Sequence, residues 1–204
     1  MERLRMAVFA SGNGSNFQAL VDAIQEGQLH ATMELLVCDR PTVKVVERAE
    51  QAGVDTFLFH PKQYANREAY EMEILKQLEE KQIDLVVLAG YMRIITETLV
   101  TPYYGRLINI HPSLLPAFPG KDAIQQALDY GTKMTGVTVH FVDGGMDTGP
   151  IIAQRAVAID EGALSEDVTQ SVQRIERELY PQVVQWFCEG RIQLIDRIVH
   201  INHS

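Results

Sequence analysis

Two polar residues separated by a single apolar one are the first candidates for chemistry. Asn109 and His111 stand in the run Asn109-Ile110-His111-Pro112. Residues two apart on a strand point to the same side, and Pro112 keeps His111 out of the helical region. An amide beside an imidazole can stabilise an oxyanion and carry a proton. An isolated histidine with a purely structural role would show the same spacing.

A glycine-rich segment supplies a candidate carboxylate. The segment reads Asp143-Gly144-Gly145-Met146-Asp147-Thr148-Gly149-Pro150, and its glycines allow a backbone path that brings Asp147 close to a partner. A carboxylate within a few ångströms of His111 would favour the imidazolium and raise its pKa. The same Asp and Gly content is typical of a hairpin turn, so both interpretations stay open.

A second glycine-rich run, Ser11-Gly12-Asn13-Gly14-Ser15-Asn16, follows a short apolar stretch and precedes a helical pattern. Glycines permit a tight turn, and the free N–H groups at a helix start bind phosphate. The dinucleotide fingerprint needs a third glycine where Phe17 stands, and no lysine follows as in a phosphate-loop NTPase. The alternative is a plain strand-to-helix turn capped by Ser15 or Asn16.

Covalent and metal chemistry find little support in the sequence. Ser113 follows a proline and lacks the strained elbow of a hydrolase nucleophile. Cys38 and Cys188 have apolar neighbours and are expected to be buried thiols. His, Asp and Glu do not cluster at metal-ligand spacing. We therefore expect no covalent intermediate and no metal.

The elements that must position these residues alternate between strands and helices. An uninterrupted apolar run within residues 84–89 indicates a strand buried on both faces, as in a parallel sheet. Pro181 is expected to kink or divide the last helix, and residues 191–201 are expected to form an edge strand or a tail. The pattern predicts an α/β, Rossmann-like fold, with a mostly parallel twisted sheet and helices on both faces. Strands are expected over 4–10, 33–38, 55–59, 84–89, 107–110, 136–142 and 151–159, and helices over 16–26, 43–51, 64–81, 123–130 and from 165 onward.

Length and charge limit the classes of partner. The chain has 204 residues, 46% of them hydrophobic, which suits a single domain over 1–204. The balance of 18 basic against 27 acidic residues, a net charge of −9, disfavours a nucleic-acid partner. No apolar run approaches the roughly 18 residues of a membrane span, and no signal-peptide core is evident. We expect a cytoplasmic protein without membrane association.

Five motifs occur together in the order of one enzyme family. They are SGNGSN at 11–16, GYMRII at 90–95, NIHPSLLP at 109–116, the strand at 136–141 and MDTGP at 146–150. With these motifs the sequence resembles the phosphoribosylglycinamide formyltransferase family, the folate-dependent formyltransferases of purine biosynthesis. The similarity extends from residue 4 to about residue 190. It implies a phosphate-binding half over about 1–100 and a folate-binding, catalytic half over about 101–190.

The resemblance implies transfer of the formyl group of 10-formyltetrahydrofolate, a co-substrate, to the amine of 5-phosphoribosylglycinamide. Asn109 and a protonated His111 would stabilise a tetrahedral oxyanion, with Asp147 keeping His111 charged. The proton would move through His111 or a water molecule. By the same resemblance, the catalytic residues are Asn109, His111 and Asp147; the acceptor would contact Gly14, Ser15, Asn16, Gln173 and Glu176; and the folate would contact Arg67, Met92, Arg93, Ile94, Ile95, Asn109, Asp143, Gly144, Gly145, Met146 and Asp147.

Two positions depart from the family pattern. Gly144 and Gly145 replace a pair that is often bulkier or acidic in the family, so this loop is expected to be more mobile. Asp122 stands where many members carry histidine and receives no role. Neither departure involves the three catalytic residues. The resemblance is compatible with either a monomer or a homodimer.

Other readings remain as alternatives. Methionyl-tRNA formyltransferases share the Asn, His and Asp pattern but add a nucleic-acid-binding domain, and sugar-nucleotide formyltransferases and formyltetrahydrofolate hydrolases are also longer. A non-catalytic nucleotide-binding module would have no reason to combine Asn109, His111 and Asp147. An NAD-dependent oxidoreductase is disfavoured by Phe17, although Asp39 lies where a ribose-binding acid would stand.

Overall fold

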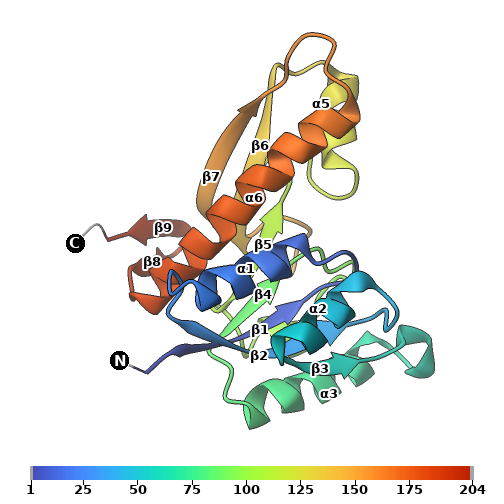
Figure 1. Cartoon of the computed structure of the whole chain (residues 1–204), viewed down its shortest axis with the longest axis vertical. Helices are drawn as coiled ribbons and strands as arrows, with labels where there is room; N and C mark the ends of the chain where they lie inside the picture. Colours follow the sequence, from blue (N-terminus) through green and yellow to red (C-terminus); the bar gives the residue numbers. More distant parts are fainter. Residues whose placement is uncertain (1, 203–204) are drawn as a thin grey trace.

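The computed structural model describes residues 2–202 and contains a seven-stranded sheet in the order β3-β2-β1-β4-β5-β6-β7 (Figure 1). The first five strands are parallel, β6 is antiparallel to β5, and β7 is antiparallel to β6. The mostly parallel α/β sheet predicted from the sequence is therefore confirmed. The strands are β1 (Leu4–Phe9), β2 (Ala31–Cys38), β3 (Asp55–Leu58), β4 (Leu85–Leu88), β5 (Leu107–His111), β6 (Met134–Phe141) and β7 (Ile151–Ala158).

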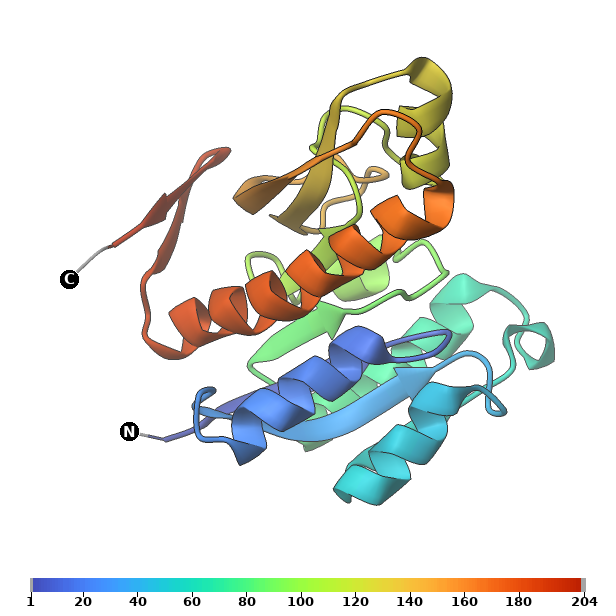
Figure 2. The ribbon, with the colours of Figure 1, turned by 45° about the horizontal axis from the view of Figure 1, so that its top comes forward.

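Helices cover both faces of the sheet because the central strands are apolar on both sides. In β1, Met6 and Val8 pack with α1, α2 and α6, whereas Ala7 and Phe9 pack with α3 and α4 on the opposite face. Figure 2 shows α1 and α6 together on the first of these faces. The helices are α1 (Ser15–Gln25), α2 (Lys44–Ala52), α3 (Arg67–Glu80), α4 (Glu97–Val100), α5 (Ala123–Tyr130) and α6 (Ser165–Cys188), with a 3₁₀ turn, η1 (Pro61–Gln63).

The strand order reverses between β1 and β4, and this is where open α/β sheets place their ligands. The loop after β1 contains residues 11–14, and the loop after β4 contains residues 89–96. Both therefore lie at the carboxyl edge of the sheet. This brings two of the sequence motifs together although about 80 residues separate them in the chain.

The C-terminal region differs from expectation in two ways. Helix α6 runs without interruption through Pro181, so the expected division of this helix is wrong. Leu179 and Tyr180 before the proline, and Val183 after it, are all buried in one core, and this packing offsets the missing hydrogen bond. Residues 192–201 form neither an edge strand of the main sheet nor a tail, but a separate hairpin of β8 (Ile192–Ile195) and β9 (Ile198–Ile201).

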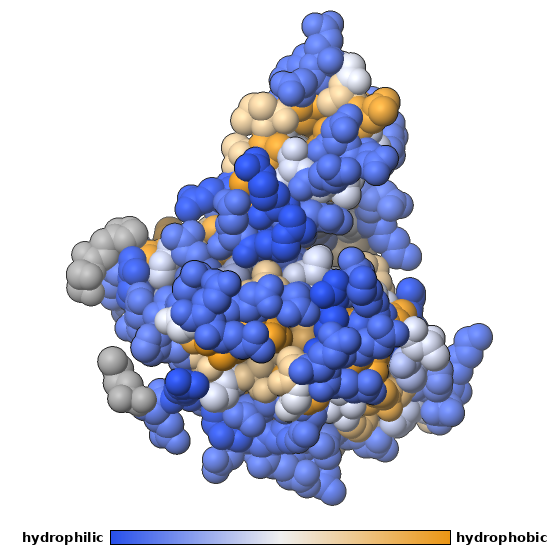
Figure 3. Space-filling model, in the orientation of Figure 1, coloured by the Kyte–Doolittle hydropathy of each residue, from blue (hydrophilic) through white to orange (hydrophobic). Residues whose placement is uncertain are grey.

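The two cysteine thiols differ in their exposure. Cys38 is buried as expected, but Cys188 is only half-buried. Burial raises the pKa of both thiols, that of Cys188 to about 11. The face in Figure 3 is mostly hydrophilic, with apolar side chains gathered near the top of the view, around the upper ends of β6 and β7, and in a band below α1. Within residues 2–202, no helix is long and apolar enough to cross a membrane.

The Tyr180 hydroxyl connects α6 to the two central strands. The side chain is fully buried, and its oxygen lies 2.7 Å from the carbonyl oxygen of Leu88 in β4 and 3.3 Å from that of Ile108 in β5. One hydroxyl proton serves both carbonyls, so the bond is shared. Helix α6 is thereby held across the strands that lead into the motifs at 90–95 and 109–116.

We expect Tyr180→Phe to destabilise the fold by about 1 kcal/mol, because it removes a buried hydrogen bond. This corresponds to a decrease in Tm of roughly 2–4 °C for a chain of this size. Tyr91→Phe is the matched control, since the Tyr91 hydroxyl is buried without a partner in the described structure. Its removal should leave Tm unchanged or raise it. Thermal unfolding of both variants followed by circular dichroism tests this, and equal decreases in Tm would contradict it.

Candidate active site

Asn109 and His111 project from the same face of β5. Ile108 and Ile110, which alternate with them, pack in the core beneath α6. The two polar side chains therefore take the opposite face, as the spacing predicts. His111 is 5% exposed and Asn109 is half-buried. The structure thus places the amide and the imidazole side by side at the carboxyl end of this strand.

Asp147 reaches this face from the loop between β6 and β7. Its Oδ2 lies 3.4 Å from Nδ1 of His111, and it accepts a hydrogen bond of 2.7 Å from the backbone N–H of Gly120. The loop is thus a hairpin connection and also brings a carboxylate to His111, so the two interpretations of this segment hold together. Asp147 has φ of 55°, a left-handed conformation that aspartate tolerates better than most residues.

The environment of Asp147 keeps its carboxyl group charged. Burial alone raises its pKa, but hydrogen bonds from His140 and from the Gly120 N–H, together with the charge of His111, lower the pKa below its ordinary value. A carboxylate of this kind is ionised over the whole neutral range. The fixed negative charge therefore faces two imidazoles at once.

His140 is the polar residue of this cluster that the sequence interpretation missed. Its Nε2 lies 3.3 Å from Nδ2 of Asn109 and 3.6 Å from Oδ1 of Asp147. Its Nδ1 lies 2.8 Å from the Phe141 carbonyl oxygen, which can only accept, so Nδ1 carries a proton. Nε2 of His140 thus faces both the Asn109 amide and the Asp147 carboxylate. In this strand, polar residues alternate with Val137, Val139 and Phe141. This alternation is the sequence pattern that could have placed His140 on a polar face of the strand.

Both ring nitrogens of His111 already have partners. Nδ1 faces Asp147, and Nε2 donates to the Phe118 carbonyl oxygen at 2.9 Å. Phe118 has φ of 53°, which is unusual for an aromatic residue. The loop after β5 thus holds the His111 ring through the carbonyl oxygen of Phe118, a residue whose backbone is strained. For Nε2 to donate to a substrate oxygen, the ring must leave Phe118.

The segment 90–95 presents only part of the predicted folate contacts. Met92 and Ile94 are 61% and 50% exposed, as a ligand-binding segment requires. Ile95 is 6% exposed and its side chain packs in the core with α3 and α4. Arg67, at the start of α3, is exposed, and the Nε of Arg93 is bonded to Asp39.

The loop that contains residues 143–147 lies against the side chain of Glu97 at the start of α4. A Cβ placed on Gly144 would lie 2.8 Å from Oε1 of Glu97, at the start of α4. The Asp143 carboxylate braces the loop internally by accepting hydrogen bonds from the Gly145 N–H at 2.9 Å and the Thr148 hydroxyl at 2.6 Å.

The run 11–16 forms a left-handed turn into α1. Gly14 has φ of 76°, and α1 begins at Ser15 without a side-chain cap, so the alternative of a turn capped by Ser15 or Asn16 is wrong. Instead Nδ2 of Asn16 lies 3.3 Å from Oε2 of Glu176, and the Asn16 Oδ1 is buried without a partner in the described structure. Burial raises the pKa of Glu176. Gln173, one turn earlier on α6, is exposed.

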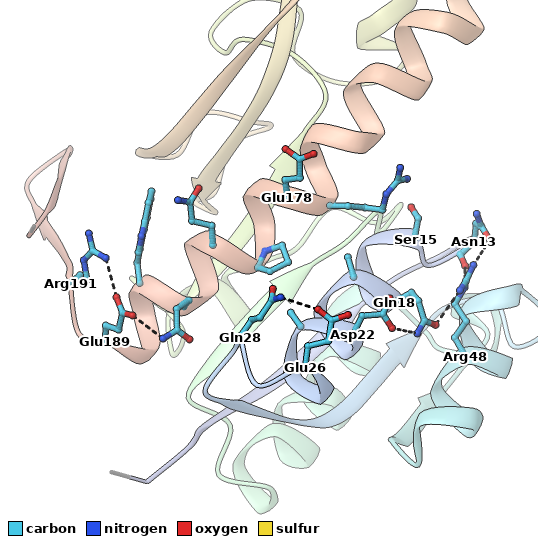
Figure 4. Close-up of a pocket in the computed structure, with 17 residues that line it drawn as sticks. Asn13, Ser15, Gln18, Asp22, Glu26, Gln28, Arg48, Glu178, Glu189 and Arg191 are labelled. Carbon is cyan, nitrogen blue, oxygen red and sulfur yellow. Dashed lines mark hydrogen bonds and ion pairs between the residues drawn. The ribbon is translucent and has the colours of Figure 1, made fainter.

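A groove of about 850 Å³ runs between α1 and α6 (Figure 4). Asn13 and Ser15 line one end of it, where Arg48 donates to the Asn13 carbonyl oxygen at 2.8 Å. Neither His111 nor Asp147 is among its lining residues. This groove therefore borders the loop 11–14 but is separate from the cluster on β5.

Asp39 is not available for a nucleotide ribose. Its side chain is completely buried and bonded to Ser11 and Arg93. This removes the one feature that favoured an NAD-dependent oxidoreductase. Within residues 2–202, no group of three or more His, Cys, Asp and Glu residues is arranged to hold a metal ion.

The chain is similar to known proteins over most of its length. The model of the formyl transferase family matches residues 4–184. A phosphoribosylglycinamide formyltransferase of Bacillus subtilis (strain 168) is 52% identical over 181 residues, covering 89% of this chain and 93% of the relative. The enzyme of the same name from Escherichia coli (strain K12) is 40% identical over 191 residues, covering 94% and 90%. The crystal structure of glycinamide ribonucleotide transformylase 1 from Symbiobacterium toebii superposes with a TM-score of 0.95 at 42% identity, covering 98% and 94%. The chain belongs to the formyl transferase family.

Proposed function

We propose that this protein transfers the formyl group of 10-formyltetrahydrofolate to the amine of 5-phosphoribosylglycinamide, in purine biosynthesis. The observation that carries the proposal is the cluster of Asn109, His111, His140 and Asp147 on one face of β5 and β6. It lies in a chain that is similar over most of its length to enzymes named for this activity. A module that only binds nucleotides has no use for such a cluster.

The reaction needs oxyanion stabilisation and one proton transfer. The acceptor amine attacks the formyl carbon, which forms a C–N bond and a tetrahedral oxyanion. The Asn109 amide donates a hydrogen bond to that oxygen, and Nε2 of the His111 imidazolium does so once the ring has left the Phe118 carbonyl. The bond from the formyl carbon to N10 of the folate then breaks, and the proton lost by the amine moves to N10. Asp147 balances the charge of His111 throughout. His111 or a water molecule carries the proton.

The acceptor binds at the start of α1. Backbone N–H groups of Gly14, Ser15 and Asn16 bind its phosphate, because a helix start offers free donors and a favourable dipole. The unpartnered Oδ1 of Asn16 and the buried Glu176 carboxyl accept hydrogen bonds from its ribose or glycinamide end, with Gln173 nearby on α6. The phosphate then contributes remote binding energy that holds the amine near the formyl carbon.

The folate binds between segment 90–95 and the loop 143–147. Met92 and Ile94 offer exposed apolar contacts, and the loop adds polar ones. Arg67 and Arg93 are the nearby cations of this set. We further propose that residues 1–204 act as a single cytoplasmic domain, as a monomer or homodimer, without a nucleic-acid partner. In this arrangement no metal takes part in the reaction.

We expect the purified protein to convert 10-formyltetrahydrofolate to tetrahydrofolate only when 5-phosphoribosylglycinamide is present. The physical reason is that attack requires the amine to be held at the formyl carbon. A spectrophotometric folate assay with and without the acceptor measures this. Glycinamide without the phosphoribosyl group is the control acceptor and should react far more slowly. Turnover that ignores the acceptor would overturn the proposal, whereas turnover with another amine only would indicate a related formyltransferase.

A further inference from the structure

Three loops meet around one buried carboxylate at the carboxyl edge of the sheet. Asp39 directly follows β2, and its side chain is 0% exposed. Its Oδ1 lies 2.5 Å from the hydroxyl of Ser11, which follows β1, and its Oδ2 lies 2.7 Å from Nε of Arg93, which follows β4. A buried charge persists only when it is paired and hydrogen-bonded. Asp39 is therefore satisfied entirely by the two neighbouring loops.

Ser11 extends this connection to the backbone of the folate segment. Its hydroxyl oxygen accepts a hydrogen bond from the Met92 N–H at 2.9 Å, and its own N–H donates to the Gly90 carbonyl oxygen at 3.1 Å. Met92 itself has little packing, because its side chain is 61% exposed. The conformation of residues 90–93 consequently depends on polar contacts with Ser11 and Asp39.

The other end of the same segment is held in the same way. Glu71 in α3 is 1% exposed, and it accepts hydrogen bonds from the Thr96 N–H at 3.1 Å and from the Thr96 hydroxyl at 2.5 Å. Buried carboxylates therefore fix the segment on both sides. The exposed side chains between them, Met92 and Ile94, are presented from a backbone that has little freedom to move.

We propose that Asp39, acting through Ser11 and Arg93, is a positioning residue that holds segment 90–95 in the conformation that binds 10-formyltetrahydrofolate. This rests on the proposed function. In a dinucleotide-binding protein the acid at the end of the second strand faces a ribose. Here it is turned inward and supports the adjacent loop. A pre-organised segment loses less freedom on binding, so loosening it weakens folate binding without changing the chemical step.

Asp39→Asn tests the proposal because it keeps the size of the side chain and an acceptor for Ser11, but removes the charge paired with Arg93. We expect KM for 10-formyltetrahydrofolate to rise about five- to tenfold, the size expected for loss of one ordinary hydrogen bond. We expect kcat and KM for the acceptor to stay within about twofold. Asp55→Asn is the matched control. It removes a carboxylate paired with Lys81 at 2.5 Å at the opposite edge of the sheet, and it should leave all three constants unchanged.

A second variant and a binding measurement make the outcomes distinct. Ser11→Ala removes the Met92 contact and should raise the same KM, and the double variant should exceed the larger single effect by less than about twofold, because both act on one segment. If the KM increases of the two single variants multiply in the double variant, Asp39 and Ser11 do not act on the same segment, and the proposal is overturned. A lower Tm with unchanged KM in Asp39→Asn means a purely structural role and also overturns it.

Tetrahydrofolate binding measured by calorimetry supplies a readout that does not depend on turnover. An unchanged Kd in Asp39→Asn refutes the positioning role. A wild-type protein without acceptor-dependent turnover refutes the proposed function instead.

Discussion

Replacing Asp147 with asparagine is expected to lower kcat by at least about a hundredfold while the protein stays folded. Within residues 2–202, Asp147 is the carboxylate that faces both His111 and His140, at 3.4 and 3.6 Å. An asparagine keeps the shape but loses the negative charge that faces the two imidazoles. Its amide group also presents a donor where the histidine needs an acceptor. Steady-state rates at saturating concentrations of both substrates measure the effect.

The control for this experiment lies in the same region of the molecule. Asp122 has φ of 55°, equal to that of Asp147, and it has no proposed role. Because asparagine tolerates the left-handed region as well as aspartate does, Asp122→Asn tests the backbone effect of the exchange alone. It should keep kcat within about twofold. Near-normal turnover in Asp147→Asn would remove this residue from the mechanism.

Replacing Asn109 with alanine is expected to lower kcat by about a hundred- to a thousandfold, the usual cost of losing one oxyanion donor. The KM values should change little, because the lost hydrogen bond is strongest in the transition state. Single-turnover measurements of formyl transfer separate this effect from slow product release. Asn109 is half-buried, and its amide nitrogen contacts Nε2 of His140. The variant therefore removes little packing.

A second substitution at this position separates the donor from the side chain's shape. Asn109→Asp retains the size but has no N–H to donate at neutral pH. If Asn109 acts as a donor, both variants should be impaired to a similar degree. An aspartate variant with near wild-type kcat would show that shape alone is needed, and the oxyanion role would then be wrong.

Much of the fold was predictable because its signals are local. The wholly apolar run 85–89 predicted a strand buried on both faces, and β4 (Leu85–Leu88) is buried at every position. The i, i+2 spacing placed Asn109 and His111 on one face. The prediction that Pro181 divides the last helix was wrong. The local cost of the proline is offset by core packing of the residues on both sides of it, and the sequence around Pro181 does not reveal this packing.

The parts of the site that escaped prediction depend on contacts between distant residues. His140 joins the cluster because β6 pairs with β5 in a register that sets it opposite Asn109. No feature of the two separate segments specifies that register. The burial of Ile95 was missed because segment 90–95 is irregular, so it has no period from which a buried face can be read. The internal use of Asp39 depends on a partner 54 residues away.

The place of α6 in the fold has a consequence for how the protein is made. Val168, Val172 and Val183 of this helix close the same core that Met6 and Val8 begin, so the first and last parts of the chain bury one another. While the ribosome is still adding residues before Ser165, the apolar face of β1, β4 and β5 remains open to water. Nascent chains at this stage expose a surface that chaperones bind and that promotes aggregation. Only after α6 emerges can the sheet be sealed and Glu176 reach Asn16, so the acceptor site is one of the last features to form.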